Sequence, residues 1–235
     1  MASGIYAATA GAVAQSNALD VTANNISNAN TTAFKGARVA FRQAMAAAQS
    51  VDVAMVGAGT GGVDTTNGAL TQTGNPLDVA IDGDGYLAVE TPRGVRYTRD
   101  GALQLDDQGM LVTAGGLRLR GDGGPIQIPP GTAQVAIEPD GTVHADDSVV
   151  GKLQLVHLAP GSETRDGDQL IASRAAPLAG PPPRLVSGVL EGSNVNVVRG
   201  VVDLVKVSRS YESLLKIIQG YHDVEARAAR EIGGK

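Results

Sequence analysis

Residues 197–234 read VVRGVVDLVKVSRSYESLLKIIQGYHDVEARAAREIGG. Apolar positions recur in this stretch at alternating intervals of four and three residues, which is typical of a helix that packs along another helix. The predicted seam comprises Val197, Val201, Leu204, Ser208, Tyr211, Leu215, Ile218 and His222. About 36 helical residues would extend about 54 Å. A helix of that length needs more than a small β domain to bury its apolar side.

Further apolar residues of this stretch lie off the predicted seam. They are Val198, Val202, Val205, Leu214, Ile217 and Val224. A helix that is apolar on more than one side usually has more than one neighbour. A hairpin between the two ends of one chain would leave the outer face exposed. The pattern therefore favours packing in a larger array of subunits.

The beginning of the chain predicts a second helix of about 23 residues. Ile5, Ala12, Leu19 and Ile26 recur every seven residues and form its predicted packing seam. The polar stretch NNISNANTT, residues 24–32, should end this helix because its side chains compete for backbone hydrogen bonds. We expect Asn25 and Asn28 to shape the turn that leaves the helix.

The middle of the chain has a different character. All eleven prolines lie between Pro76 and Pro183, and alternating apolar residues flank several Asp-Gly pairs, which predict hairpin turns. Residues 51–190 carry nine bases and seventeen acids, a net charge of −8, whereas the two ends are nearly neutral. The chain is therefore expected to be α+β, with long terminal helices that pair as a coiled-coil-like stem and an antiparallel β-rich middle.

Composition excludes several classes of function. The absence of cysteine excludes disulfides, thiolate zinc sites and a cysteine nucleophile. A net charge of −5 argues against nucleic-acid binding. We expect no membrane insertion, because residues 1–19 contain polar residues throughout, and no cleaved signal peptide, because no base precedes Ala12-Val13-Ala14.

Three apparent site motifs do not carry chemistry. Gly57–Gly62 matches GxGxxG, but no helical stripe follows it, as a dinucleotide site requires. Asp78, Asp82 and Asp84 resemble a calcium loop, but Ala80 and Val89 occupy two ligand positions. The histidines are isolated from one another at positions 144, 157 and 222. We therefore predict no catalytic residue, no cofactor and no metal.

The two ends resemble the bacterial flagellar basal-body rod proteins. GIYAATAGAVAQSNALDVTANNISNANTTAFKG (Gly4–Gly36) is similar to the opening signature of that family. LEGSNVNVV (Leu190–Val198) and RSYE (Arg209–Glu212) are similar to its closing signature. In the middle, GNPLDVAIDGDGYLAV, YTRDGALQLDDQGMLVT and IPPG resemble the outer domain of rod subunits. Two departures are Ser208, where the family usually has Gln, and Gly200 inside the helix.

The resemblance implies a structural rod subunit, proximal rather than distal, and not an enzyme. Residues 1–34 and 190–235 would form a discontinuous inner-tube domain, residues 35–68 a connector and residues 69–189 the outer domain. The subunit-packing residues would be Ile5, Ala12, Leu19 and Ile26, together with Val197, Val201, Leu204, Tyr211, Leu215 and Ile218. Arg209 and Glu212, at i and i+3, could form an ion pair within or between subunits.

The resemblance also implies partners and a location. The partners would be copies of the same chain and other rod proteins, with hook and rotor-ring proteins as further candidates. The assembly would be a hollow shaft that transmits torque across the periplasm, built from subunits exported without a cleaved signal peptide. Two alternatives stay open: a distal rod or hook subunit of the same family, and a soluble β-domain enzyme or carbohydrate-binding module with helical flanks.

Overall fold

The computed structural model describes residues 2–45, 54–167, 169–178 and 180–233. The chain divides into two compact units. We call residues 1–27, 37–61 and 196–235 the helical unit, and residues 28–36 and 62–195 the β unit. The expected α+β class and the pairing of the terminal helices are confirmed. The domain boundaries expected from the sequence stay a prediction.

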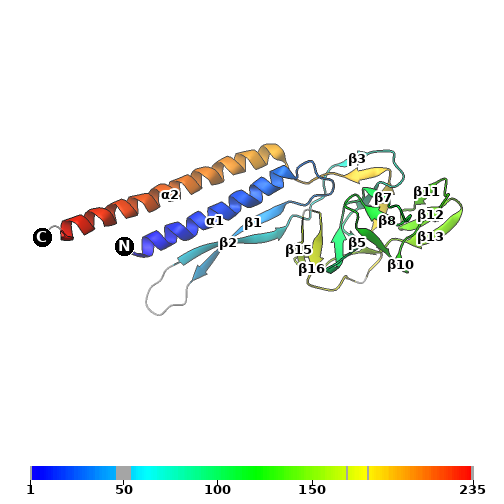
Figure 1. Ribbon diagram of the computed structural model, residues 1–235, viewed down its shortest axis with the longest axis horizontal. Helices are drawn as coiled ribbons and strands as arrows, with labels where there is room; N and C mark the ends of the chain where they lie inside the picture. Colours follow the sequence, from blue (N-terminus) through cyan, green and yellow to red (C-terminus); the bar gives the residue numbers. More distant parts are fainter. Residues whose placement is uncertain (1, 46–53, 168, 179, 234–235) are drawn as a thin grey trace. The chain divides into compact units, whose positions relative to one another are not determined.

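The helical unit contains two long helices that lie side by side (Figure 1). Helix α1 spans Ala2–Ser27 and helix α2 spans Val197–Gly233, and they run antiparallel. Strands β1 (Ala37–Met45) and β2 (Ala54–Val63) form a two-stranded sheet, and α1 packs on β1 as well as on α2. Both strands lie within residues 35–68, which the sequence predicted as a connector. Four glycines in β2 weaken its strand pattern.

The β unit is built around a nine-stranded antiparallel sheet. The order of its main path is β15–β16–β6–β5–β9–β8–β7, with β10 paired to β9 and β14 paired to β5. These strands are β5 (Tyr86–Thr91), β6 (Gly94–Thr98), β7 (Leu103–Leu105), β8 (Leu111–Thr113), β9 (Arg118–Gly121), β10 (Gly124–Pro125), β14 (Leu155–Val156), β15 (Glu163–Arg165) and β16 (Ile171–Ser173).

Three smaller sheets complete the β unit. One has the order β11–β12–β13, and the other two pair β17 with β4 and β18 with β3. Their strands are β3 (Leu70–Gln72), β4 (Val79–Asp82), β11 (Val135–Ile137), β12 (Thr142–Ala145), β13 (Ser148–Lys152), β17 (Arg184–Ser187) and β18 (Val189–Glu191). Strands β17 and β18 carry the chain back across the unit to the segment that precedes α2.

The Asp-Gly pairs play two different roles in this arrangement. Three of them connect strands that pair with each other, as predicted: Asp122-Gly123, Asp140-Gly141 and Asp166-Gly167. The other three do not join paired strands. Asp82-Gly83 and Asp84-Gly85 lie between β4 and β5, and Asp100-Gly101 lies between β6 and β7; neither pair of strands is hydrogen-bonded to each other. An Asp-Gly pair supplies a tight change of direction, and only the strand register decides whether the two flanking strands bond.

The larger of two hydrophobic clusters in the described part of the β unit is aliphatic. Its members include Leu87, Leu119 and Val143, which have no exposed surface, and branched side chains from β4, β8 and β17 pack around them. Full burial of one such side chain contributes about 1.5–3 kcal/mol. The unit therefore closes its core with Leu, Ile and Val, in keeping with the low aromatic content of the sequence.

Candidate assembly surface

Three glycines set the register between α1 and α2. A Cβ atom on Gly11 would lie 3.3 Å from Leu214 Cδ1, and one on Gly200 would lie 2.8 Å from Ile26 Cγ1. Gly4 lies in the same way against the Tyr221 ring. In an antiparallel pair the residue numbers of opposing positions have a constant sum, and these contacts give sums of 225 and 226. Each missing side chain makes room for a large one on the other helix.

Gly200 therefore has a packing role. A glycine in a helix interior costs about 1 kcal/mol relative to alanine. Here the absence of a Cβ atom on Gly200 leaves room for the side chain of Ile26 against the first turn of α2. Helix α1 also carries buried alanines, Ala8 and Ala12 among them.

The stripe of α2 that faces α1 lies beside the predicted one. It follows the residues at 200, 204, 207, 211, 214, 218 and 221, each of them partly buried. Leu204, Tyr211 and Ile218 belong to it. Val197, Val201 and Leu215, also predicted as subunit-packing residues, lie outside this stripe and are 37–45% exposed, so their contact with another subunit stays a prediction. On α1, Ala12 is buried, and Ile5, Leu19 and Ile26 are partly buried.

The beginning of α2 carries an apolar patch that no described residue covers. Val197, Val198, Val201, Val202 and Val205, which we call the valine patch, are 44–76% exposed. At 100° per residue the patch is centred about 135° around the helix from the α1-facing stripe. Valine is a poor helix former, so five exposed valines gain nothing from helix propensity. Such a patch is typical of a protein contact.

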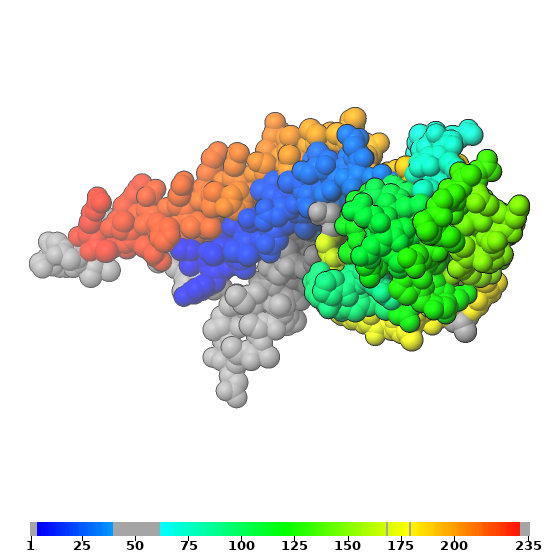
Figure 2. Space-filling view, turned by 45° about the vertical axis from the view of Figure 1, so that its right-hand side comes forward, coloured from blue at the N-terminus to red at the C-terminus, as the bar shows by residue number. Residues whose placement is uncertain are grey.

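A smaller apolar surface lies on α1. Tyr6 is 62% exposed and Val13 is 56% exposed. They are seven residues apart, so they share one face of the helix, about 165° around it from the face that contacts α2. Figure 2 shows the two helices packed along their length, which leaves outer flanks on both of them.

The polar residues predicted at the helix exit make local contacts. The Asn25 side chain accepts a hydrogen bond from the Ala37 backbone amide and donates one to the Ala37 carbonyl, both at 2.9 Å. Asn28 Oδ1 accepts a hydrogen bond from the Thr31 hydroxyl at 3.0 Å. Asn25 thus attaches the last turn of α1 to the start of β1.

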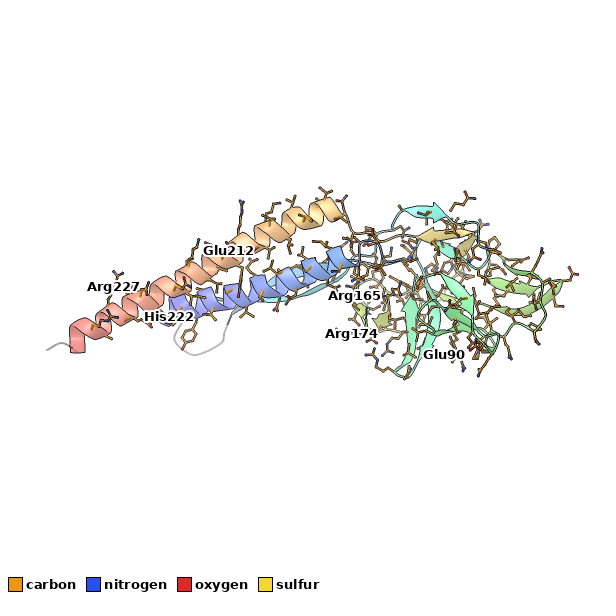
Figure 3. The ribbon with its side chains drawn as sticks, turned by 45° about the horizontal axis from the view of Figure 1, so that its top comes forward. Glu90, Arg165, Arg174, Glu212, His222 and Arg227 are labelled. Atoms are coloured by element: carbon orange, nitrogen blue, oxygen red, sulfur yellow. The ribbon has the colours of Figure 1, made fainter. Side chains whose placement is uncertain are left out.

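The predicted pair of Arg209 and Glu212 is not joined in the described part of the chain. Both side chains are exposed, and Glu212 is visible on α2 in Figure 3. The ion pair present nearby joins Lys206 to Asp203 at 3.4 Å. A contact of Arg209 or Glu212 with another subunit stays a prediction.

A buried ionic cluster in the β unit was not predicted. The Glu191 carboxylate, which is fully buried, accepts hydrogen bonds from Lys35 Nζ at 2.7 Å and Arg99 Nε at 2.7 Å. It accepts a third from the Gly68 amide at 2.9 Å. The other guanidinium nitrogens of Arg99 donate hydrogen bonds to backbone carbonyls of β4 and of the β4–β5 turn. We call Lys35, Arg99 and Glu191 the junction cluster.

The junction cluster joins distant parts of the sequence. Lys35 follows α1 closely, Glu191 precedes α2 closely, and Arg99 follows β6. The only sequence signal was that each is a charged residue within a family-like motif: FKG, YTRDG and LEGSNVN. The cluster fixes the segments that lead out of α1 and into α2 to one core.

Burial and pairing oppose each other in this cluster. Burial disfavours the charge on Glu191, but the hydrogen bond from Lys35 and the charge of Arg99 outweigh it and hold the pKa of Glu191 below its usual value. Burial lowers the pKa of Lys35, and its hydrogen bond to Glu191 limits that effect. Removal of the carboxylate would therefore strand two buried cations.

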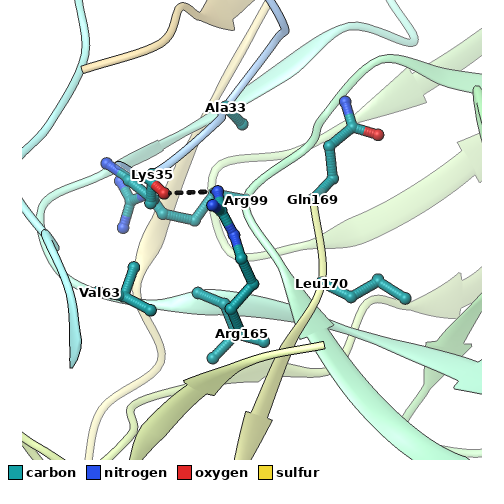
Figure 4. Close-up of a pocket in the computed structure, with 8 residues that line it drawn as sticks. Ala33, Lys35, Val63, Arg99, Arg165, Gln169 and Leu170 are labelled. Carbon is teal, nitrogen blue, oxygen red and sulfur yellow. Dashed lines mark hydrogen bonds between the residues drawn. The ribbon is translucent and has the colours of Figure 1, made fainter. Parts of the chain in front are cut away.

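A small pocket beside the cluster is lined by Ala33, Lys35, Val63, Arg99, Arg165, Gln169, Leu170 and Ile171 (Figure 4). Arg165 donates a hydrogen bond to the Lys35 carbonyl at 2.8 Å, and its guanidinium lies 4.1 Å from the centre of the Phe34 ring. These contacts hold residues 33–35 in place. Among the described residues no group of three or more potential metal ligands gathers.

Comparison with protein families defines the class of the chain. Residues 5–35 match the model "Flagella basal body rod protein". Residues 80–145 match "Flagellar hook protein FlgE/F/G D1 domain", and residues 186–231 match "Flagellar basal body rod FlgEFG protein C-terminal". The chain belongs to the flagellar basal-body rod protein family.

Individual relatives agree with this assignment. The chain is 39% identical over 243 residues to the flagellar basal-body rod protein FlgF of Escherichia coli, covering 95% of this chain and 96% of that one. It is 30% identical to FlgF of Rhizobium meliloti, covering 100% and 99%. It is 34% identical to the basal-body rod protein FlgG of Bacillus subtilis, covering 85% and 88%.

Family membership settles the main functional prediction. The protein is a structural rod protein and not an enzyme, and the alternative of an enzyme with helical flanks has no support. None of the described helices is long and apolar enough to cross a membrane.

Proposed function

We propose that this protein builds the proximal segment of the flagellar rod by packing its helical unit against other copies of itself and against other rod proteins. The observation that carries the proposal is the exposure of apolar residues on both helices after those helices have paired. The similarity to FlgF chains over nearly their whole length supports the proximal position over the distal one. Hook and rotor-ring proteins are further candidate partners.

In this proposal the helical unit forms the wall of a hollow shaft and the β unit forms its outer layer. The domain division expected from the sequence belongs to this proposal, with residues 1–34 and 190–235 inside and 69–189 outside. Asn25 and Asn28 shape the exit from α1, and the contacts of Asn25 with Ala37 support that role. Contacts between subunits that do not close on themselves produce a helical filament, and such a filament can transmit torque across the periplasm. Export without a cleaved signal peptide is part of the proposal.

The experiment that tests the proposal is mass spectrometry of purified hook–basal bodies, with a strain that lacks the gene as its control. We expect the protein in the wild-type particles and truncated rods in the deletion strain. The point of truncation distinguishes a proximal from a distal position. Intact rods and normal swimming in the deletion strain would contradict the proposal.

A further inference from the structure

The outer faces of α1 and α2 are complementary to each other. The valine patch includes Val198 and Val205, which are seven residues apart, and α1 exposes Tyr6 and Val13 at the same spacing. Two helices whose apolar residues share a seven-residue spacing can interdigitate over that length. The two surfaces face away from each other on the paired helices, so they cannot meet within one chain.

We infer that the valine patch of one copy packs on the Tyr6–Val13 face of a neighbouring copy that points in the same direction. This inference rests on the proposed function, because it specifies which surfaces join neighbouring rod subunits. In this contact Val205 lies opposite Tyr6 and Val198 lies opposite Val13, so opposing residue numbers sum to 211. The corresponding sum within one chain is 225.

The difference between the two sums fixes a displacement. Fourteen residues at 1.5 Å per residue correspond to an axial offset of about 21 Å between neighbouring copies. Each copy presents both halves of the contact, so the contact repeats from one copy to the next and does not close after two copies.

Charge supports a second copy as the occupant. Helix α1 carries Asp20 as its one charged side chain. In the inferred register Asp20 lies opposite position 191, before α2 begins, so it is not buried against the valines. Within the patch segment, Arg199 and Asp203 are on other sides of α2 by the 100° rule. Burial of an unpaired charge would be unfavourable, and the inferred contact buries none.

The chain offers a direct test because it has no native cysteine. Two variants would be co-expressed, one with Val13→Cys and the other with Val198→Cys, and basal bodies would be isolated after mild oxidation. We expect a disulfide-linked dimer on a non-reducing gel, and likewise for Tyr6→Cys with Val205→Cys. The mismatched combination of Val13→Cys with Val205→Cys is displaced by about 10 Å and should stay unlinked. Each variant expressed alone should also stay unlinked.

The outcomes separate the inference from the proposed function. Protein present in basal bodies but unlinked in both matched combinations would overturn the inference and leave the rod function intact. Equal cross-linking of matched and mismatched combinations would overturn it as well. Absence of the protein from basal bodies would overturn both.

A charge substitution provides a second measurement. Val198→Asp combined with Val202→Asp should lower the amount of protein in basal bodies at least tenfold. Ser213→Asp, at an exposed polar position of the same helix, should leave the amount unchanged. Normal incorporation of the double variant would contradict the inference.

Discussion

The β unit completes its own interior, whereas the helical unit does not. In the β unit, residues such as Leu87 and Leu119 are fully buried, and even Glu191 has all its partners within the unit. In the helical unit, the valine patch and Tyr6 remain exposed after α1 and α2 have paired. The contrast indicates that one part of the chain is stable alone and the other requires neighbours.

The largest loss of stability is expected when the carboxylate of the junction cluster is removed. Glu191→Leu would leave Lys35 and Arg99 buried without a counter-charge and should lower the free energy of unfolding of the β unit by about 3–5 kcal/mol. Urea unfolding followed by circular dichroism measures this loss. The control Glu90→Gln, at an exposed residue labelled in Figure 3, should change stability by less than about 0.5 kcal/mol. A similar small effect for both variants would show that the junction cluster does not stabilise the unit.

Two substitutions that shorten an apolar side chain, one in each unit, should differ in their effect on stability. Leu119→Ala removes a fully buried side chain and should cost about 2–5 kcal/mol. Val201→Ala removes an exposed one, so it should leave the unfolding of the isolated chain nearly unchanged. The same Val201→Ala variant should incorporate poorly into basal bodies, as immunoblotting would show. A large loss of stability from Val201→Ala in the isolated chain would contradict the division between the units.

The lowered pKa of Glu191 makes the stability of the β unit depend on pH. Its pKa is lowered in the folded state, so the stability it contributes is present above its ordinary value near 4.5 and is lost as the pH falls through the folded pKa. Burial raises the pKa of Asp100, which acts in the opposite direction. Unfolding free energies measured between about pH 7 and pH 3 should fall less steeply in Glu191→Gln than in the unmodified chain. Parallel curves would argue against a linked carboxylate.

The smallest changes in stability are expected from alanine substitutions at two glycines of α2. Gly220→Ala meets no atom within 4 Å and should stabilise the helix by about 1 kcal/mol. Gly200→Ala has the same intrinsic gain but places a Cβ 2.8 Å from Ile26, so it should stabilise less or destabilise. Helix content measured by thermal circular dichroism compares the two. Equal gains would mean that the register deduced from Gly200 is wrong.

The sequence predicted the helices and the β-rich middle because both depend on local periodicity. The C-terminal helix was expected from Val197 onward with about 36 residues, and α2 has 37. The side that faces α1 was harder to predict, because apolar residues occupy two sides of α2 and spacing alone does not say which side meets which neighbour. Gly200 and Leu214 define the observed side.

Two features could not be predicted from local patterns. Strand β2 could not be predicted because its glycines have low strand propensity and leave no alternation of apolar and polar side chains. The junction cluster unites Lys35 with Glu191 across 156 positions of sequence. No local pattern encodes such a pairing, which depends on the return of the chain through β17 and β18.

Hydrogen–deuterium exchange of the full chain in dilute solution measures directly whether the two units differ in stability. We expect strong protection of backbone amides in the core strands β5, β8 and β9. We expect rapid exchange along α1 and α2, because exposed apolar helices without their neighbours open easily. The same helices should become protected once the protein is part of isolated basal bodies. Equal protection of both units in the dilute chain would contradict the claim that the helical unit depends on other subunits.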